Sequence, residues 1–193
     1  MIFVIIAVLA YCAGSINFAI LFFRLMKKAD PRDRFSGNPG VTNVYRQAGG
    51  VAAALVLLLD AGRAAAVSAA ALYFLSPPAV AWSGLALLIG NRYPCFHQFK
   101  GGKGVANYLG FSAVIVPLGA FFACIAWAVA FGVARRPFIA SFFMVGVLAG
   151  ATIFKWADYP LAIAGAVAAA LFIVYNHRDN MSALLNTRPS GNG

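Results

Sequence analysis

The chain has 193 residues, 62% of them hydrophobic and 10% charged, whereas a soluble domain carries about 25% charged residues. This composition excludes an ordinary water-soluble domain. The formal net charge of +10 lies mostly between apolar segments rather than in one patch, so anionic lipid headgroups and anionic small molecules are the expected partners and nucleic acid is not. Several apolar segments approach the roughly 20 residues that cross a bilayer, which predicts an all-α polytopic membrane protein.

The first predicted transmembrane helix covers residues 2–23 and is expected to be retained, because no convincing cleavage site follows it. Basic residues after it place the next loop in the cytoplasm by the positive-inside rule. The second predicted helix, residues 51–74, contains Asp60 and Arg63 on one helical face. An ion pair at that depth must face the bundle interior, and a structural role is favoured over direct chemistry.

The third predicted helix covers residues 79–93, and the next apolar segment, 105–134, is too long for one crossing. A continuous helix there would measure roughly 45 Å at ~1.5 Å per residue, against a hydrocarbon core of about 30 Å. A break within residues 112–117 yields a short, re-entrant-like helix and a full one. The break also returns Arg135 and Arg136 to the cytoplasm, as their charge favours.

Helices over residues 138–154 and 161–175 complete the prediction. Residues 1–193 then form a single integral-membrane domain of seven transmembrane helices, one of them short and re-entrant-like, with the N-terminus outside and the C-terminus in the cytoplasm. Every Lys and Arg except Arg63 and Lys155 lies on the cytoplasmic side in this topology. No group of Asp, His or Cys has ligand spacing, so neither a metal nor a cofactor is expected.

The first candidate site is the polar stretch of residues 36–46, Ser-Gly-Asn-Pro-Gly-Val-Thr-Asn-Val-Tyr-Arg. Gly37 and Gly40 permit unusual backbone conformations, and Pro39 fixes a turn. With short hydroxyl and amide side chains and Arg46 beside them, these residues are typical of a backbone that curls around phosphate. The alternative is a flexible polar turn, and this stretch alone does not separate the two.

Two further polar clusters follow. Residues 100–104, Lys-Gly-Gly-Lys-Gly, form a second candidate phosphate site. They lack the Ser or Thr and the preceding strand of a P-loop, so nucleotide hydrolysis is not expected. His177 and Asn180 form the third cluster and would share a face if the last helix continues, although an ordinary interfacial helix end is the alternative there. All three clusters are predicted to meet at the cytoplasmic face.

These residues together resemble a known family, the bacterial acyl-phosphate:glycerol-3-phosphate acyltransferases of the PlsY type. The resemblance covers nearly the whole chain, in order and spacing. Its motifs are Gly14-Ser15-Ile16, Asp30-x-Arg32, Ser36-Gly37-Asn38-x-Gly40-x-Thr42-Asn43-x-x-Arg46, Lys100-Gly101-Gly102-Lys103-Gly104-Val105-Ala106, Arg135 followed by Ser141, and His177-x-x-Asn180. The resemblance implies a seven-helix bacterial inner-membrane enzyme of phospholipid biosynthesis. Its reaction would transfer a fatty acyl group from acyl phosphate to the 1-hydroxyl of sn-glycerol 3-phosphate, giving lysophosphatidic acid and phosphate.

The resemblance also implies which residues line the active site. Carried over position by position, they are Ser36, Gly37, Asn38, Gly40, Thr42, Asn43, Arg46, Gly101, Gly102, Lys103, Ser141, His177 and Asn180. The candidate catalytic residues among them are His177, Asn180, Ser36 and Lys103. Acyl phosphate is already activated, so the protein needs mainly to position the substrates and stabilise charge. The proton acceptor is either His177 or the substrate's own phosphate; the phosphate is favoured, with His177 as a binding and orienting group.

The chain departs from the family pattern at several positions. Asn17 replaces the usual proline, Phe35 a glycine, Asn91 a histidine, Phe138 a serine, Ala183 an arginine and Pro189 an acidic residue. These changes leave a divergent, inactive paralogue as one alternative. A small-anion transporter is the other, but such a protein would carry paired repeats and polar groups near the bilayer midplane. The residues specify neither an oligomeric state nor an acyl-chain preference.

Overall fold

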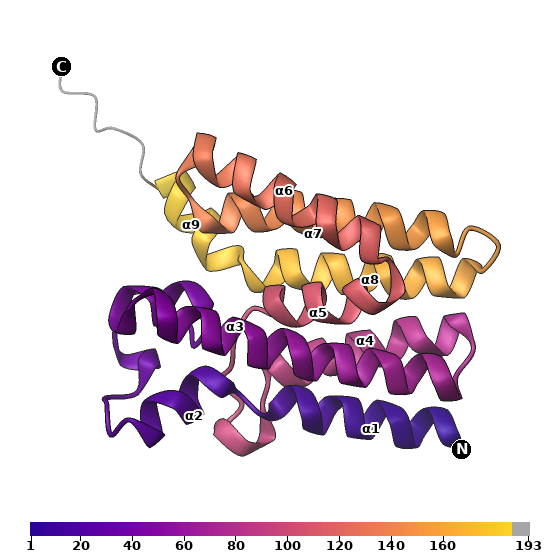
Figure 1. Cartoon of the computed structure of the whole chain (residues 1–193), viewed down its shortest axis with the longest axis horizontal. Coiled ribbons are helices and arrows are strands. Elements are labelled where there is room, and N and C mark those ends of the chain that lie inside the picture. The colour runs from indigo at the N-terminus through magenta and orange to yellow at the C-terminus, as the bar shows by residue number, and fades with distance from the viewer. Residues whose placement is uncertain (187–193) are drawn as a thin grey trace.

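The computed structural model describes residues 1–186, which form α-helices and no strand. The helices are α1 (Ile2–Ser15), α2 (Phe18–Leu25), α3 (Val41–Phe74), α4 (Pro77–Arg92), α5 (Val105–Ile115), α6 (Pro117–Ala134), α7 (Pro137–Lys155), α8 (Pro160–Asn176) and α9 (Arg178–Asn186). Two short 3-10 turns, η1 (Pro31–Asp33) and η2 (Cys95–His97), lie in the polar loops. The N-terminus lies at one end of the bundle, and α9 lies at the other (Figure 1). The predicted all-α class is confirmed.

The first predicted helix is interrupted near its C-terminal end. Ile16 and Asn17 are extended and separate α1 from α2. Asn17 caps α2, because its Oδ1 accepts a hydrogen bond from the Ile20 N–H at 3.0 Å, while its Nδ2 donates to the Pro39 carbonyl at 3.2 Å. The interruption therefore attaches the first helix to the loop that carries the first polar cluster.

The second predicted helix begins earlier than expected, at Val41 rather than at residue 51. Gly40 precedes the first turn, and Gly49, with φ of +83°, bends the chain before the apolar part of α3. Thr42, Asn43 and Arg46 therefore lie on helical turns. This corrects the prediction that residues 36–46 form one curled loop.

The predicted break in the 105–134 segment is confirmed at Val116, and Pro117 begins the next helix. Proline suits that position, where its missing N–H would have no helical partner. The carbonyl of Ile115, the last residue of α5, accepts a hydrogen bond from Lys155 Nζ at 2.5 Å. The end of the short helix is therefore held by a side chain from α7.

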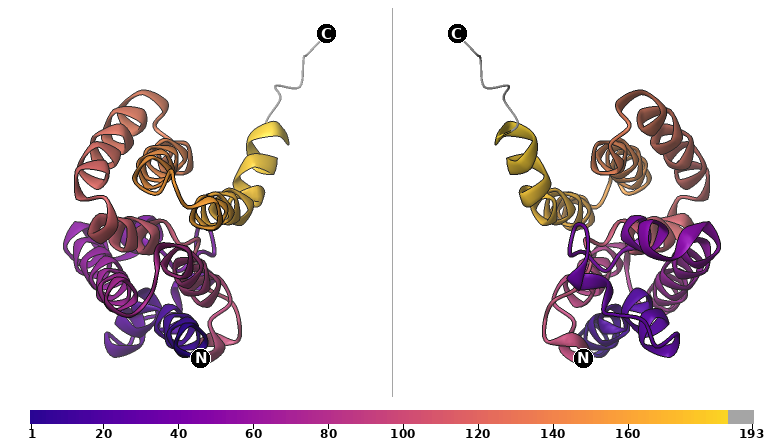
Figure 2. Two further views of the ribbon diagram at one scale, coloured as in Figure 1. Left: turned by 90° about the vertical axis from the view of Figure 1, so that its right-hand side faces the viewer. Right: turned by 90° about the vertical axis from the view of Figure 1, so that its left-hand side faces the viewer.

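The bundle is organised around α4, which packs on α1 and on α8, while α3 packs on α5 and α6 packs on α7. Viewed along the bundle, the indigo and purple helices form one group and the orange and yellow helices form another (Figure 2). Small residues allow close crossings: a Cβ on Gly14 or Gly90 would overlap backbone where α1 meets α4, and one on Gly110 would overlap the backbone of α3.

Four segments within residues 1–186 are long and apolar enough to cross a membrane. They are Ile2–Leu25, Val41–Phe74, Pro117–Ala134 and Pro137–Lys155. The α8 helix passes the same test only together with α9, from which it is bent by 46°. The last helix therefore bends at His177. The prediction that His177 and Asn180 share one face of a continuous helix required a straight helix there.

Candidate active site

Arg32 joins the loop between α2 and α3 to the loop between α4 and α5. It pairs with Asp30 at 2.7 Å and donates to the backbone oxygens of His97 at 3.0 Å and Lys100 at 3.3 Å. Hydrogen bonding to the Arg32 guanidinium holds the pKa of Asp30 below its ordinary value. Arg32 is thus engaged in fixing the two polar loops against each other.

Side chains of α3 hydrogen-bond to the loop that leads into the first polar cluster. Asn43 Nδ2 and Gln47 Nε2 both donate to the Pro31 carbonyl, at 2.8 and 3.0 Å. Asn43 is buried, and its Oδ1 has no hydrogen-bond partner within residues 1–186. The exposed members of the cluster are Ser36, Gly37, Thr42 and Arg46, and the half-buried members are Asn38 and Gly40.

The glycines of the second cluster are buried against the end of α4. The Gly101 and Gly102 amides donate to the carbonyls of Arg92 at 3.1 Å and Asn91 at 3.0 Å. A Cβ on Gly101 would overlap the Asn91 carbonyl, and one on Gly102 would lie 3.4 Å from the Pro39 carbonyl. Glycine is needed here because the loop passes between α4 and the first polar cluster. Both amides are occupied within the protein, so this cluster offers a ligand the charges of Lys100 and Lys103 rather than free backbone N–H groups at Gly101 and Gly102.

Lys103 and Asn180 bring the second and third clusters together. Lys103 Nζ donates to Asn180 Oδ1, and Asn176 Nδ2 donates to the Lys103 carbonyl at 3.4 Å. Burial lowers the pKa of Lys103 to about 8, against a raising effect of Asp179. Lys103 is therefore a cation at neutral pH, and a bound anion would favour that form further.

His177 is buried at the bend between α8 and α9. Its Nδ1 lies 2.8 Å from the Ile173 carbonyl. Since a carbonyl only accepts, Nδ1 carries the proton and Nε2 is left as an acceptor. Burial lowers the pKa of His177 to about 4, and the charges of Lys103 and Arg92 act in the same direction. The imidazole is therefore neutral near pH 7.

Phe142 of α7 contacts this cluster, and Ser141 precedes it in the same helix. The Phe142 ring stands edge-on to the His177 ring, with centroids 5.3 Å apart. Ser141 is 7% exposed, and its hydroxyl donates to the Pro137 carbonyl at 2.9 Å. Within residues 1–186, Ser36, Thr42 and Arg46 make no hydrogen bond to Lys103, His177 or Asn180. The structure therefore joins Lys103, Asn180 and His177 directly and leaves the exposed first cluster nearby.

A polar pocket of about 420 Å³ connects the first two clusters. Gly37 lines it from the first loop, and Lys100 and Gly101 line it from the second, with Arg92 at the end of α4. Several of its lining side chains are exposed, so the pocket opens to solvent. Its cations, Arg32, Arg92 and Lys100, outnumber its carboxylates, Asp30 and Asp33. Its size and its net positive lining therefore suit a small phosphorylated molecule.

The comparisons with known proteins agree on one family. Residues 4–187 match the model of the family described as glycerol-3-phosphate acyltransferase. The glycerol-3-phosphate acyltransferase of Methylobacillus flagellatus is 36% identical over 192 residues, covering 98% of this chain and 96% of that protein. The one from Laribacter hongkongensis is 38% identical over 185 residues, covering 93% and 90%.

A solved structure matches over the full length. The crystal structure of PlsY (YgiH), an integral membrane glycerol 3-phosphate acyltransferase in its glycerol 3-phosphate form, gives a TM-score of 0.87 at 31% identity, covering 100% of this chain and 96% of that one. The chain belongs to the glycerol-3-phosphate acyltransferase family. It is a multi-pass membrane protein, and the resemblance read from its motifs is confirmed.

Three departures from the acyltransferase family pattern can be related to local structure. Phe35, where glycine is usual, has φ of +55°, a left-handed conformation that favours glycine. Asn17 caps α2 in place of the usual proline. Phe138 stands edge-on to Phe142, with ring centroids 6.0 Å apart, and so extends the aromatic contact on His177. Nothing in the structure explains Ala183, and Pro189 lies outside the described residues.

The fourth departure from the acyltransferase family pattern, Asn91, belongs to a buried network of hydrogen-bonded polar side chains. No motif in the sequence predicted this network. Asn107 Nδ2 donates to Asn91 Oδ1 at 2.9 Å, and Arg63 Nη2 donates to Asn107 Oδ1. Arg63 also pairs with Asp60 at 3.1 Å. The Asn91 backbone carbonyl also accepts a hydrogen bond from the Gly102 N–H. The network therefore extends from the middle of α3 to the glycine loop. The expected structural role of the Asp60–Arg63 pair fits this placement.

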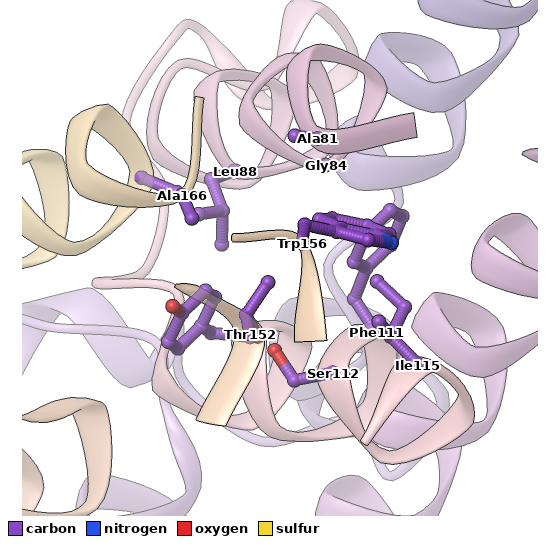
Figure 3. A pocket seen from close by; sticks show the side chains of 11 residues that line it. Ala81, Gly84, Leu88, Phe111, Ser112, Ile115, Thr152, Trp156 and Ala166 are labelled. Atoms are coloured by element: carbon purple, nitrogen blue, oxygen red, sulfur yellow. The ribbon is translucent and has the colours of Figure 1, made fainter. Parts of the chain in front are cut away.

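An apolar cavity lies apart from the polar loops, between α4, α5, α7 and α8. Leu88, Phe111 and Trp156 are among the side chains around it (Figure 3). Its volume is about 20 Å³, whereas one water alone needs roughly 10–15 Å³. The cavity is therefore far too small for a fatty acyl chain.

Proposed function

We propose that this chain transfers a fatty acyl group from acyl phosphate to the 1-hydroxyl of sn-glycerol 3-phosphate, releasing lysophosphatidic acid and inorganic phosphate. The observation that carries the proposal is the contact of Lys103 with Asn180, which joins the second and third polar clusters beside His177. The polar pocket between the first two loops supports the same conclusion, because its cations Arg32, Arg92 and Lys100 suit phosphate. Family membership supports the choice of acceptor, since one solved relative is described in a glycerol 3-phosphate form and another in a lysophosphatidic acid form.

In the proposed reaction, the oxygen of the 1-hydroxyl attacks the carbonyl carbon of acyl phosphate. A carbon–oxygen bond forms, the bond from the carbonyl carbon to the phosphate oxygen breaks, and the hydroxyl proton passes to a phosphate oxygen. Phosphate is a competent leaving group, so the protein supplies position and charge. Lys103, Arg46 and Ser36 bind phosphate oxygens, Asn180 and His177 orient the glycerol hydroxyls, and the remaining polar residues of the three clusters complete the site.

The state of His177 supports its role as an orienting group. Its Nε2 accepts a hydrogen bond from the acceptor hydroxyl, but a pKa of about 4 makes it a weak base. Replacing His177 with Gln should therefore lower kcat/KM and leave the shape of the pH profile unchanged. A profile that loses a limb in H177Q would instead identify His177 as the base.

Purified protein supplied with acyl phosphate and sn-glycerol 3-phosphate tests the function directly. We expect phosphate release that depends on glycerol 3-phosphate, with lysophosphatidic acid formed in equal amount. Binding without turnover would favour the inactive paralogue. Uptake of phosphate into proteoliposomes without acyl transfer would favour the anion transporter.

We further propose that the chain is one domain that crosses a bacterial inner membrane seven times. The N-terminus is placed outside, the C-terminus in the cytoplasm, and α5 serves as the short, re-entrant-like segment. The distribution of charge supports this topology, since the loops at residues 26–40, 93–104 and 135–136 carry eight of the fifteen Lys and Arg. The three polar clusters then face the cytoplasm, where glycerol 3-phosphate is in solution. The acyl chain lies between helices in contact with membrane lipids.

A further inference from the structure

Arg92 has no assigned role, yet it lies where the polar clusters meet. It is the last residue of α4, and its carbonyl accepts the Gly101 amide at 3.1 Å. Its half-buried side chain lines the polar pocket together with Gly37 and Gly101. Its backbone therefore holds the glycine loop, while its guanidinium faces the space between the first two clusters.

The guanidinium of Arg92 has no carboxylate partner among the described residues. Its Nε is buried without a hydrogen-bond partner, and its Cζ lies 5.7 Å from the Tyr93 ring centroid. Among the acidic side chains nearby, Asp30 pairs with Arg32, and the mostly exposed Asp179 lies 3.9 Å from Arg178. Asp33 also lines the pocket, but it is exposed and forms no salt bridge with Arg92 within residues 1–186. A partly buried cation with a donor left unpaired is unfavourable unless an anion binds it.

The positive charge of Arg92 also acts electrostatically on Lys103 and His177. After burial, which is the main cause, Arg92 contributes to lowering the pKa of both Lys103 and His177. These three side chains therefore lie close enough to repel one another when charged. A dianionic ligand between Arg92 and Lys103 would relieve that repulsion.

We propose that Arg92 is an additional substrate-binding residue of this acyltransferase, whose guanidinium binds a phosphate group in the pocket between the first and second polar loops. The inference rests on the proposed function for the identity of the substrates. The shared chemistry is a phosphate dianion, supplied either by sn-glycerol 3-phosphate or by acyl phosphate. Arginine suits this role because its planar fork binds two phosphate oxygens at once.

Binding measurements on the purified protein test the proposal independently of turnover. Affinities for inorganic phosphate and sn-glycerol 3-phosphate are measured by calorimetry for the wild type, R92Q and R92K, and the KM for acyl phosphate is measured in parallel. We expect R92Q to weaken binding of at least one phosphate compound, or to raise the KM for acyl phosphate, on the order of tenfold. R92K should recover part of that loss. The compound that is affected identifies which phosphate Arg92 binds.

The matched control is K28Q, which removes one exposed positive charge outside the pocket and should change none of these values. Unchanged affinities and KM in folded R92Q, an equal loss in R92K, or a wild type that binds neither phosphate compound would each overturn the proposal. A wild type that binds sn-glycerol 3-phosphate through Arg92 but transfers no acyl group would overturn the proposed function alone.

Discussion

Lys103 and His177 are in different protonation states near neutral pH, although they belong to one site. The half-buried Lys103 ammonium loses its proton as pH rises through about 8, whereas His177 gains one only as pH falls through about 4. The site therefore keeps one cation and one neutral imidazole over the whole range between these values. A positive Lys103 is suited to bind phosphate, and a neutral His177 is suited to accept a hydrogen bond from a hydroxyl.

This behaviour predicts an alkaline limb in the pH profile. We expect kcat/KM to fall as pH rises through about 8, by about tenfold per pH unit beyond it. In K103R the alkaline limb should move to higher pH, since arginine keeps its positive charge. Steady-state rates from pH 5 to 10 in both proteins give the measurement, and the ionisation of the substrates is the same in each. A limb at the same pH in K103R would assign it to another group.

Phe35 carries a second prediction at this scale. It is 70% exposed and has a left-handed backbone, which costs an L-residue roughly 1–2 kcal/mol. F35G should therefore raise the free energy of unfolding by about 1 kcal/mol and retain activity. F35A is the matched control, because it removes the ring but keeps the Cβ that causes the strain. Equal thermal stabilities of F35G and F35A would contradict the backbone explanation.

At the scale of elements, the site is held by helix ends and by side chains that fix loops. Arg32 ties the first polar loop to the second, Asn17 ties α2 to the first, and Asn91 ties α4 to the second. Two loops from distant parts of the chain are thereby fixed on a scaffold of packed helices. Loops positioned in this way can bind two substrates with little loss of conformational freedom.

Close helix packing at the α1–α4 crossing gives a prediction about stability. A side chain at Gly14 would overlap the backbone of α4, so G14V should lower the free energy of unfolding by about 1–3 kcal/mol. Gly146 on α7 has nothing within 4 Å of an added Cβ, so G146V serves as the control for placing valine on a membrane helix. The fraction of monodisperse protein left after heating in detergent measures both. Equal losses would mean that the crossing tolerates a larger residue.

The elements differ in how far they follow from local sequence. Apolar length and the position of Pro117 were enough to predict the broken α5–α6 segment. The start of α3 at Val41 was missed, because Thr42 and Asn43 are weak helix formers and the first turns are held by contacts of Asn43 and Gln47 with the Pro31 carbonyl. The contact of Lys103 with Asn180 and the chain from Asp60 to Asn91 join residues far apart in sequence, and no local pattern encodes such pairs. Arg92 gave no motif signal, since only its surroundings distinguish it from an ordinary interfacial arginine.

At the scale of the whole molecule, the polar clusters gather towards one end of an apolar bundle. In Figure 1 the loop between α2 and α3 lies at the same end as α9, while the N-terminus and the turn between α7 and α8 lie at the opposite end. In the proposed orientation, this asymmetry would let water-soluble substrates enter from one side while the apolar surface remains in lipid.

The proposed orientation predicts which cysteines react from each side. Cys95, exposed in the loop between α4 and α5, should react with a membrane-impermeant maleimide in inverted vesicles and not in right-side-out vesicles. The measurement uses a protein in which Cys12 and Cys124 are replaced by serine. D158C, in the turn between α7 and α8, should show the reverse pattern when Cys95 is also replaced. Labelling of Cys95 from the outside would reverse the assigned topology.

The hydrogen bond from Lys155 to the end of α5 has a consequence for the reaction. Lys103 comes just before α5, so the depth at which its ammonium lies depends on how far that short helix is drawn towards the opposite face. Lys155 grips the far end of the same helix. In the proposed orientation, an amino group on the outer side of the bilayer would help to set the height of Lys103 on the inner side, and α5 would link the two faces of this enzyme mechanically.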